Sequence, residues 1–370
     1  MHEEPQIYPA CMTVPGRTKG STDTFVAFIN HGYNELRGGG YLSFIVPMSV
    51  TSSDAMTSLH ALLFETCEEI KVSSYSRRPV PIFEGASPRV SVFSFRRSNT
   101  PIRRLLMTKV IRRRPEETIG ELIINLKHSN VLDFCMFGRL PKLDGEIPLS
   151  ILRKIFKCKA IRDFESGRGG RVYYRAAGGE YFNVITDKPT GVSSEKYITV
   201  NERVGICLAL SSSVFWLYQQ AYADGLNLKL FEVQNFPVPD FSALSSADKS
   251  ALEVLWTSYR KDVEAHARIR NVSQNNVNFS ISRFKEYKIV FSKPIIDKID
   301  EVIGRMYGLS EEEISFLKSY ELEFRMSGDG EFMHEMAAQN AAAAKPSRRR
   351  TARPAIAADS PRAEDDEELE

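Results

Sequence analysis

The stretch Gly38-Gly-Gly-Tyr-Leu-Ser-Phe-Ile-Val-Pro47 decides how the N-terminal part of the chain folds. Its apolar run Tyr41–Val46 is too short for a helix and is typical of a buried central strand, which Pro47 ends. Upstream, Asp23 can cap a helix that the glycine run stops. The apolar face of this predicted helix consists of Phe25, Phe28, Ile29 and Leu36.

The elements that follow alternate between helix and strand. Ser52-Ser-Asp54 caps a second predicted helix, and two strands are predicted at Ile70–Tyr75 and Val90–Phe95. Such alternation is typical of an open α/β sheet. Because a long loop, residues 1–21, stands where a βαβ unit would be expected, we expect the sheet to begin in its middle. The inner face of the second helix consists of Met56, Leu59, Leu62, Leu63 and Cys67.

After about residue 115 the pattern becomes α+β. Helices are predicted at Ile119–Leu126, Leu149–Phe156, Val204–Tyr222, Ala247–Arg270, Ile295–Tyr307 and Glu311–Tyr320. Short strands are predicted at Arg171–Ala177, Tyr181–Ile185 and Tyr197–Val200. Ser310 and Glu313 have the spacing of a capping box. From about Glu335 the chain has no periodicity, so we expect disorder there.

The composition excludes several classes of protein. Of the 370 residues, 42% are hydrophobic, which is enough for a buried core. The length of the chain predicts about two domains. No apolar run approaches the ~20 residues of a membrane span, and the polar N-terminus does not resemble a signal peptide. The five scattered cysteines indicate reduced thiols in a cytoplasmic protein, with neither disulfides nor a zinc site.

The net charge of +2 conceals a basic middle. Eight basic residues and no acid lie between Arg96 and Arg114, and eight more lie between Arg153 and Arg175 against two acids. A solvated surface is the simplest explanation of one such run. Two dense basic segments interleaved with aromatic residues favour a nucleic-acid partner.

The order of these features resembles that of γ-class adenine-N6 DNA methyltransferases. Their fifth to eighth motifs resemble Asp23-Thr-Phe-Val-Ala-Phe-Ile-Asn30, the run up to Pro47, Ile82-Phe-Glu-Gly-Ala86 and Val90-Ser-Val-Phe-Ser-Phe95. Tyr173-Tyr-Arg-Ala-Ala-Gly-Gly-Glu-Tyr-Phe182 and Asp224-Gly-Leu-Asn-Leu-Lys229 resemble the target-recognition domain of the large type II members, in which both domains share one polypeptide. The resemblance covers roughly residues 22–326.

The resemblance implies the C-terminal half of a Rossmann-like methyltransferase sheet, followed by an α+β target-recognition domain and a helical C-terminal segment. The implied boundaries are an irregular lead-in (1–21), a partial methyltransferase domain (22–115), a DNA target-recognition domain (116–240), a helical closing segment (241–330) and a disordered tail (331–370). The implied reaction is methyl transfer from S-adenosyl-L-methionine to the exocyclic amine of a flipped adenine in double-stranded DNA, as in restriction-modification or phage defence.

Two motifs that this reaction needs are missing. The family uses an Asp/Asn-Pro-Pro-aromatic tetrapeptide to accept hydrogen bonds from the adenine amine, and this chain contains no Pro-Pro dipeptide. None of the Gly-x-Gly sequences follows a predicted strand and opens a helix, as a methyl-donor site requires. We therefore expect a truncated enzyme, or a split one whose N-terminal methyltransferase half is a separate chain. A non-catalytic DNA-binding specificity protein and an RNA methyltransferase are the alternatives.

The candidate site residues fall into three groups. Phe83 matches the aromatic that stacks on the flipped adenine in the family, although it would also suit a loop beside the sheet. The dense arginines favour phosphate contacts: Arg103, Arg104, Arg112, Arg113 and Arg114. The recognition region offers phosphate or base contacts, with a solvated surface as the alternative, at Arg171, Tyr173, Arg175, Lys196, Asn227 and Lys229.

Overall fold

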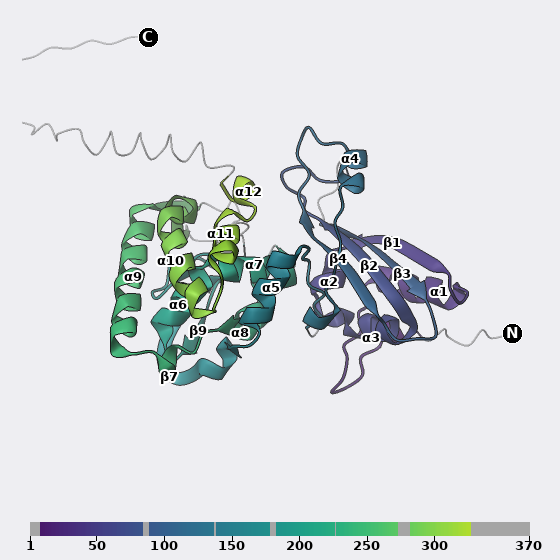
Figure 1. Ribbon diagram of the computed structural model, residues 1–370, viewed down its shortest axis with the longest axis horizontal. Coiled ribbons are helices and arrows are strands. Elements are labelled where there is room, and N and C mark those ends of the chain that lie inside the picture. The colour runs from purple at the N-terminus through teal and green to yellow at the C-terminus, as the bar shows by residue number, and fades with distance from the viewer. Residues whose placement is uncertain are drawn as a thin grey trace, which may run out of the picture. The chain divides into compact units, whose positions relative to one another are not determined.

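The computed structural model describes residues 8–83, 89–136, 138–177, 183–225, 227–272 and 282–326. One compact unit ends at Arg325 (Figure 1). The tail predicted to be disordered (331–370) lies outside the described residues, as do Tyr181 and Phe182 of one predicted strand. In the described part of the chain, no helix is both long and apolar enough to cross a membrane.

The elements alternate first and then become mainly helical. The α-helices are α1 (Thr24–Glu35), α2 (Ser49–Ser52), α3 (Thr57–Thr66), α4 (Ile119–Ile124), α5 (Glu146–Ile155), α6 (Arg203–Ser211), α7 (Ser213–Tyr222), α8 (Leu230–Asn235), α9 (Ser246–Ala265), α10 (Lys293–Met306), α11 (Glu311–Ser319) and α12 (Leu322–Met326). The strands are β1 (Tyr41–Pro47), β2 (Cys67–Tyr75), β3 (Val90–Arg97), β4 (Arg104–Ile111), β5 (Ser129–Asn130), β6 (Lys159–Ala160), β7 (Glu165–Arg175), β8 (Ile185–Thr186), β9 (Glu195–Val200), β10 (Pro237–Val238), β11 (Ala267–Val272) and β12 (Ser282–Tyr287).

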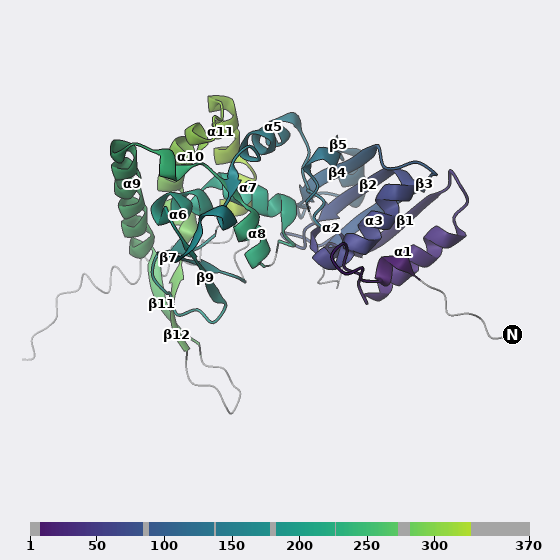
Figure 2. The same cartoon turned by 90° about the horizontal axis from the view of Figure 1, so that it is seen from below.

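The N-terminal part is a mixed five-stranded sheet in the order β1-β3-β2-β4-β5. Among the described strands of this sheet, β2 and β4 are the only parallel neighbours, because the pairs β1–β3, β3–β2 and β4–β5 are antiparallel. Figure 2 shows α1 and α3 across one face of this sheet. That face is apolar and fully buried at Ile70, Val72, Phe93, Leu105 and Met107. The predicted α/β sheet is therefore confirmed, but the structure does not identify the sheet as Rossmann-like.

The prediction that Tyr41–Val46 forms a central strand is wrong. The strand β1 pairs with β3 alone among the described residues and forms the edge of the sheet. Its outward side chains Tyr41 and Ile45 are 63% and 56% exposed. An edge position also suits Pro47, which has no backbone N–H to donate. Asp23 does stand at the N-cap of α1, but its side chain makes no capping hydrogen bond.

The strand β4 was not predicted, because its sequence lies within the basic run. Its apolar residues Leu105, Met107 and Val110 are buried, while its two charged residues, Arg104 and Lys109, are not. The apolar residues therefore place the segment in the sheet, and their alternation is interrupted by the two consecutive polar residues Thr108 and Lys109. The basic run is thus largely a structural element of the sheet.

Two predicted helices end differently in the structure. The predicted helix Val204–Tyr222 is two helices, because Ser212 has an extended backbone and the carboxylate of Asp300 accepts the N–H of Ser213 at 2.6 Å. The predicted helix Ala247–Arg270 ends with α9 at Ala265, and β11 follows and pairs with β12 as an antiparallel ribbon. The capping box of Ser310 and Glu313 is confirmed.

A buried ion pair joins the sheet to the C-terminal helices. Nε of Arg112, just after β4, donates to Glu321 at 2.9 Å, and the two side chains are 2% and 4% exposed. Its other nitrogens donate to Ser76 at 3.2 Å and to Gln220 of α7 at 3.0 Å. Nearby, Arg114 pairs with Glu323 at 2.7 Å in an exposed position.

Replacing Arg112 by alanine should destabilise the protein strongly. The variant removes the hydrogen-bonded cation of the buried Glu321 carboxylate and leaves only the more distant Lys109, whose Nζ is 3.9 Å away. Breaking a buried ion pair typically costs about 3–5 kcal/mol. Urea unfolding gives the change in the free energy of unfolding. Arg114→Ala is the matched control, and we expect it to change stability little because its ion pair is exposed to solvent. Equal effects of the two substitutions would contradict a structural role specific to Arg112.

Candidate nucleic-acid interface

The outer face of a small antiparallel sheet brings together three of the predicted recognition residues. The sheet has the order β8-β7-β9, and Arg171, Tyr173 and Arg175 alternate with Val172 and Tyr174 along β7. Val172 and Tyr174 are buried, so the first three side chains lie on the opposite, outer face.

Tyr197 of β9 completes this outer face, and the sequence analysis did not single it out. It lies directly opposite Tyr173, and the two ring centroids are 5.6 Å apart. The Cζ atom of Arg171 lies 4.6 Å from the centroid of the Tyr197 ring. Strand alternation was the available signal, because Ile198 and Val200 point inward and leave Tyr197 outward. We call Arg171, Tyr173, Arg175 and Tyr197 the recognition face.

The charge of the recognition face is positive. A hydrogen bond with Tyr173 raises the pKa of the Arg171 guanidinium, so this group remains a cation. The predicted residue Lys196 is exposed on β9, but it lies opposite the buried Tyr174, so strand alternation directs its side chain to the other face of the sheet. The neighbouring acid Glu195 accepts hydrogen bonds from the N–H and hydroxyl groups of Thr190 at 3.0 and 2.6 Å. Because its carboxylate is bound in this way, the side chain of Glu195 is held against the loop before β9.

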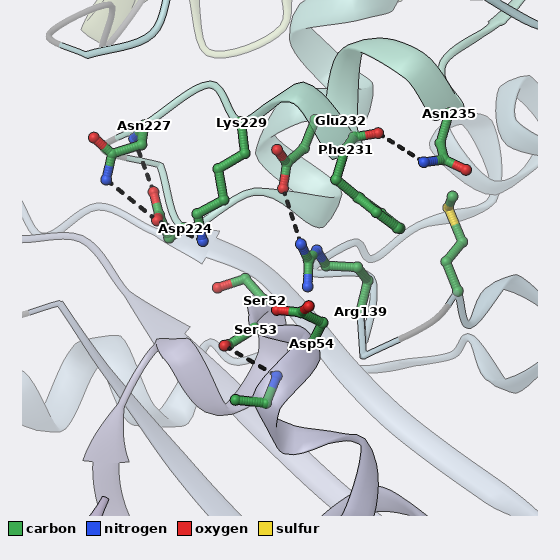
Figure 3. A network of polar contacts seen from close by, with 12 residues as sticks. Ser52, Ser53, Asp54, Arg139, Asp224, Asn227, Lys229, Phe231, Glu232 and Asn235 are labelled. Atoms are coloured by element: carbon green, nitrogen blue, oxygen red, sulfur yellow. Dashed lines mark hydrogen bonds and ion pairs between the residues drawn. The ribbon is translucent and has the colours of Figure 1, made fainter. Parts of the chain in front are cut away.

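A turn between α7 and α8 adjoins the end of β7. Residues 224, 225 and 227–229, which we call the Asp224 turn, connect to β7 through a bridge between Ala177 and Asn227. Figure 3 shows the carboxylate of Asp224 accepting hydrogen bonds from Asn227, the backbone one at 2.8 Å, with Nζ of Lys229 3.3 Å away. The predicted residues Asn227 and Lys229 therefore lie together, and both remain accessible.

The Asp224 turn is attached to the N-terminal sheet. Nη1 of Arg89, just before β3, donates to the carbonyl oxygen of Asp224 at 3.1 Å. Beside it, Arg139 and Glu232 form a buried ion pair at 3.4 Å, with the guanidinium 4.4 Å from the ring centroid of Phe231 (Figure 3). Burial raises the pKa of Glu232, while the charge of Arg139 opposes that shift. Nothing in the sequence pattern distinguished Arg139 from other isolated arginines.

Lys142 is a further buried cation in this region. Its side chain is 1% exposed, and its Nζ donates to the carbonyl oxygen of Ala221 at 2.8 Å. Burial lowers the pKa of Lys142 to about 7, and the charges of Arg139 and Arg89 act in the same direction. The nearby acids Asp224 and Glu232 oppose the shift.

The predicted phosphate-binding arginines do not form one accessible cluster. Arg112 is buried against Glu321, so its guanidinium cannot reach a phosphate in this structure, contrary to the sequence-based expectation. Arg104 pairs with Glu69 at 2.5 Å and Arg114 with Glu323, although both side chains are more than half exposed. Arg113 donates to the carbonyl oxygen of Glu117 at 2.9 Å, and Arg103 is exposed.

Phe83 lies at the end of the described segment that follows β2 and is 40% exposed. A bridge between Val80 and Arg113 holds this segment near the end of β4. The Gly-x-Gly sequences do not form a methyl-donor turn in the described residues: Gly38–Gly40 follows α1, and Gly167–Gly169 lies within β7. Across the same described ranges, no three His, Cys, Asp or Glu side chains gather to hold a metal ion.

No protein-family model and no curated protein matches the sequence. Among solved structures, the chain is similar to the Type IIL restriction-modification enzyme MmeI in complex with DNA, with a TM-score of 0.42 and 11% identity over 87% of this chain and 54% of that chain. It is also similar to the ATP-dependent Type ISP restriction-modification enzyme LlaBIII bound to DNA, with a TM-score of 0.30 and 8% identity over 83% and 34%. The chain spans about half the length of the first of these. Likenesses this distant leave the function to be argued from the residues.

Lys142→Met should remove a pH-dependent part of the stability. The folded-state pKa of about 7 lies below the ordinary value of 10.5, so the unfolded chain binds more protons between these pH values. The penalty of burying the charged lysine is therefore full below about pH 7 and is relieved as the pH rises. We expect the stability of the wild type relative to the variant to increase from neutral to alkaline pH in urea unfolding. For Lys71→Met, at an exposed position on β2, the curve of stability against pH should run parallel to that of the wild type. A Lys142→Met curve that is also parallel to the wild-type curve would contradict the role assigned to the buried lysine.

Proposed function

We propose that the chain is the DNA-recognition part of a site-specific adenine-N6 DNA methyltransferase of a restriction-modification or related phage-defence system. The observation that carries the proposal is the recognition face, whose cations and tyrosines adjoin Asn227 and Lys229 of the Asp224 turn. Cations bind the phosphate backbone, while amide and hydroxyl groups can contact base edges. The family resemblance of the sequence supplies the reaction type.

In this proposal the residues of the chain bind and position DNA. Arg171 contacts a phosphate from the recognition face, and Asn227 and Lys229 approach the bases from the Asp224 turn. Arg89 and the Arg139–Glu232 pair hold that turn against the N-terminal sheet. Phe83 stacks on the flipped adenine, for which its exposure leaves room. S-adenosyl-L-methionine would supply the methyl group from a site outside this chain, because the described residues include no strand that leads through a glycine turn into a helix.

The free edge of β1 supports a partner that carries this site. In the described residues the outer edge of β1 has no paired strand, so its backbone N–H and C=O groups can extend the sheet. Exposed apolar residues flank the edge on both sides, with Phe28 of α1 65% exposed and Ile45 of β1 56% exposed. An extended sheet with helices on its faces would cover them. We therefore propose that a strand from an N-terminal methyltransferase half pairs with β1.

Binding to duplex DNA should depend on the recognition face and fall with salt. We expect Arg171→Ala to reduce the slope of the logarithm of the binding constant against the logarithm of salt concentration by about 1, because one phosphate contact is lost. Fluorescence anisotropy with a labelled duplex measures this slope. Arg104→Ala is the comparison variant, since its guanidinium pairs with Glu69 on the N-terminal sheet, and it should leave the slope unchanged. A wild-type binding constant that does not change with salt concentration would contradict the DNA-binding proposal.

The chain alone should not bind S-adenosyl-L-methionine in calorimetry, and it should bind once the methyltransferase half is added. Ile45→Glu should prevent this assembly by placing a charge on the docking edge. Val254→Glu is the matched control, because Val254 is also an exposed apolar residue but lies on α9 and is 68% exposed. Binding of the methyl donor by the chain alone would contradict the split arrangement. Failure of every candidate half to bind would favour a non-catalytic DNA-binding specificity protein.

A further inference from the structure

The recognition face carries an aromatic pair that the core does not need. The inner face of the same strands is complete, since Val172, Tyr174 and Ile198 are buried beneath it. Tyr197 nevertheless remains 51% exposed, with Tyr173 beside it at a centroid distance of 5.6 Å. A single exposed aromatic side chain is common on protein surfaces. Two directly opposed tyrosines on the open face of an antiparallel sheet form a surface on which another flat ring can stack.

The surroundings of this pair select for a polyanion. Arg171 lies over Tyr197, and its hydrogen bond with Tyr173 connects all three side chains. Arg175 lies on the same face, two residues beyond Tyr173 along β7. Glu195, the acid nearest along β9, is bound by Thr190. A nucleotide combines an aromatic base with an anionic phosphate, and it matches both features of the face.

We propose that Tyr197, flanked by Tyr173 and Arg171, is a stacking site for an unpaired nucleobase. This inference rests on the proposed DNA-recognition function and adds a second kind of ligand to it, a locally opened strand. Within an intact duplex, the faces of each base are covered by its neighbours, so a tyrosine can stack only where the duplex is opened. Flipping of a target base creates such an opening. Open sheets that display aromatic side chains are a general solution for binding single strands.

The test compares single-stranded and duplex DNA with the whole chain. Anisotropy is measured with a labelled oligothymidylate of about 20 nucleotides, long enough to cover a typical single-strand site, and with a mixed-sequence duplex of equal length at the same salt concentration. We expect Tyr197→Leu to weaken binding of the single strand about tenfold, within the range found for loss of one base–aromatic stack. Duplex binding should change less. Tyr197→Phe should retain wild-type affinity for the single strand, since it keeps the ring.

Tyr41→Leu is the matched control. Tyr41 is 63% exposed on β1, and the Cζ atom of Arg96 lies 5.6 Å from its ring centroid, so it repeats the arginine–tyrosine arrangement away from the recognition face. It should bind both DNAs as the wild type does. Unchanged single-strand affinity in Tyr197→Leu, an equal loss on both DNAs, or an equal loss in Tyr197→Phe would each overturn the stacking proposal. A wild type that binds the duplex but not the single strand would overturn it while leaving the proposed function intact; binding neither would overturn both.

Discussion

The structure depends on the buried guanidinium of Arg112. A charged group in a protein interior is tolerated only when an opposite charge and hydrogen bonds replace its hydration shell. Arg112 receives these from three distant parts of the chain: Glu321 before α12, Gln220 of α7 and Ser76 after β2. The requirement to satisfy one cation therefore fixes where the N-terminal sheet, the central helices and the C-terminal helices meet.

The same arrangement also positions the recognition face. The helix α7 bears Gln220 near its end, and the Asp224 turn begins two residues after that helix. Arg89 and the Arg139–Glu232 pair then hold the turn from the side of the sheet and from α8. These contacts restrict the turn that carries Asn227 and Lys229, which limits the conformational freedom that the two residues would lose on binding.

Patterns of local physical origin were predictable from the sequence. The strands β2 and β3, the inner face of α3 and the capping box at Ser310 follow from periodicity and capping chemistry. Position within the sheet was not predictable, because β1 is equally apolar whether it lies at the centre or at an edge. The strand β4 was hidden by its charges, and the break between α6 and α7 depends on the carboxylate of Asp300, which is distant in sequence.

The residues of the candidate site likewise include some that the sequence predicted and some that it did not. Alternation along β7 correctly separates Arg171 and Tyr173 from the buried Tyr174. Arg112 resembled its neighbours Arg113 and Arg114 in sequence, and only the fold distinguishes the buried member from the accessible ones. Arg139 and Glu232 had no sequence signal, because their ion pair joins residues far apart in the chain.

The contact between Arg112 and Glu321 also constrains how the protein is made. These partners are 209 positions apart, so a nascent chain emerging from the ribosome exposes Arg112 long before Glu321 has been synthesised. During that interval the sheet has an unneutralised cation at the surface it must later bury, and closing so long a loop is slow. We therefore expect the final docking of the sheet to occur only after the C-terminal helices have been translated.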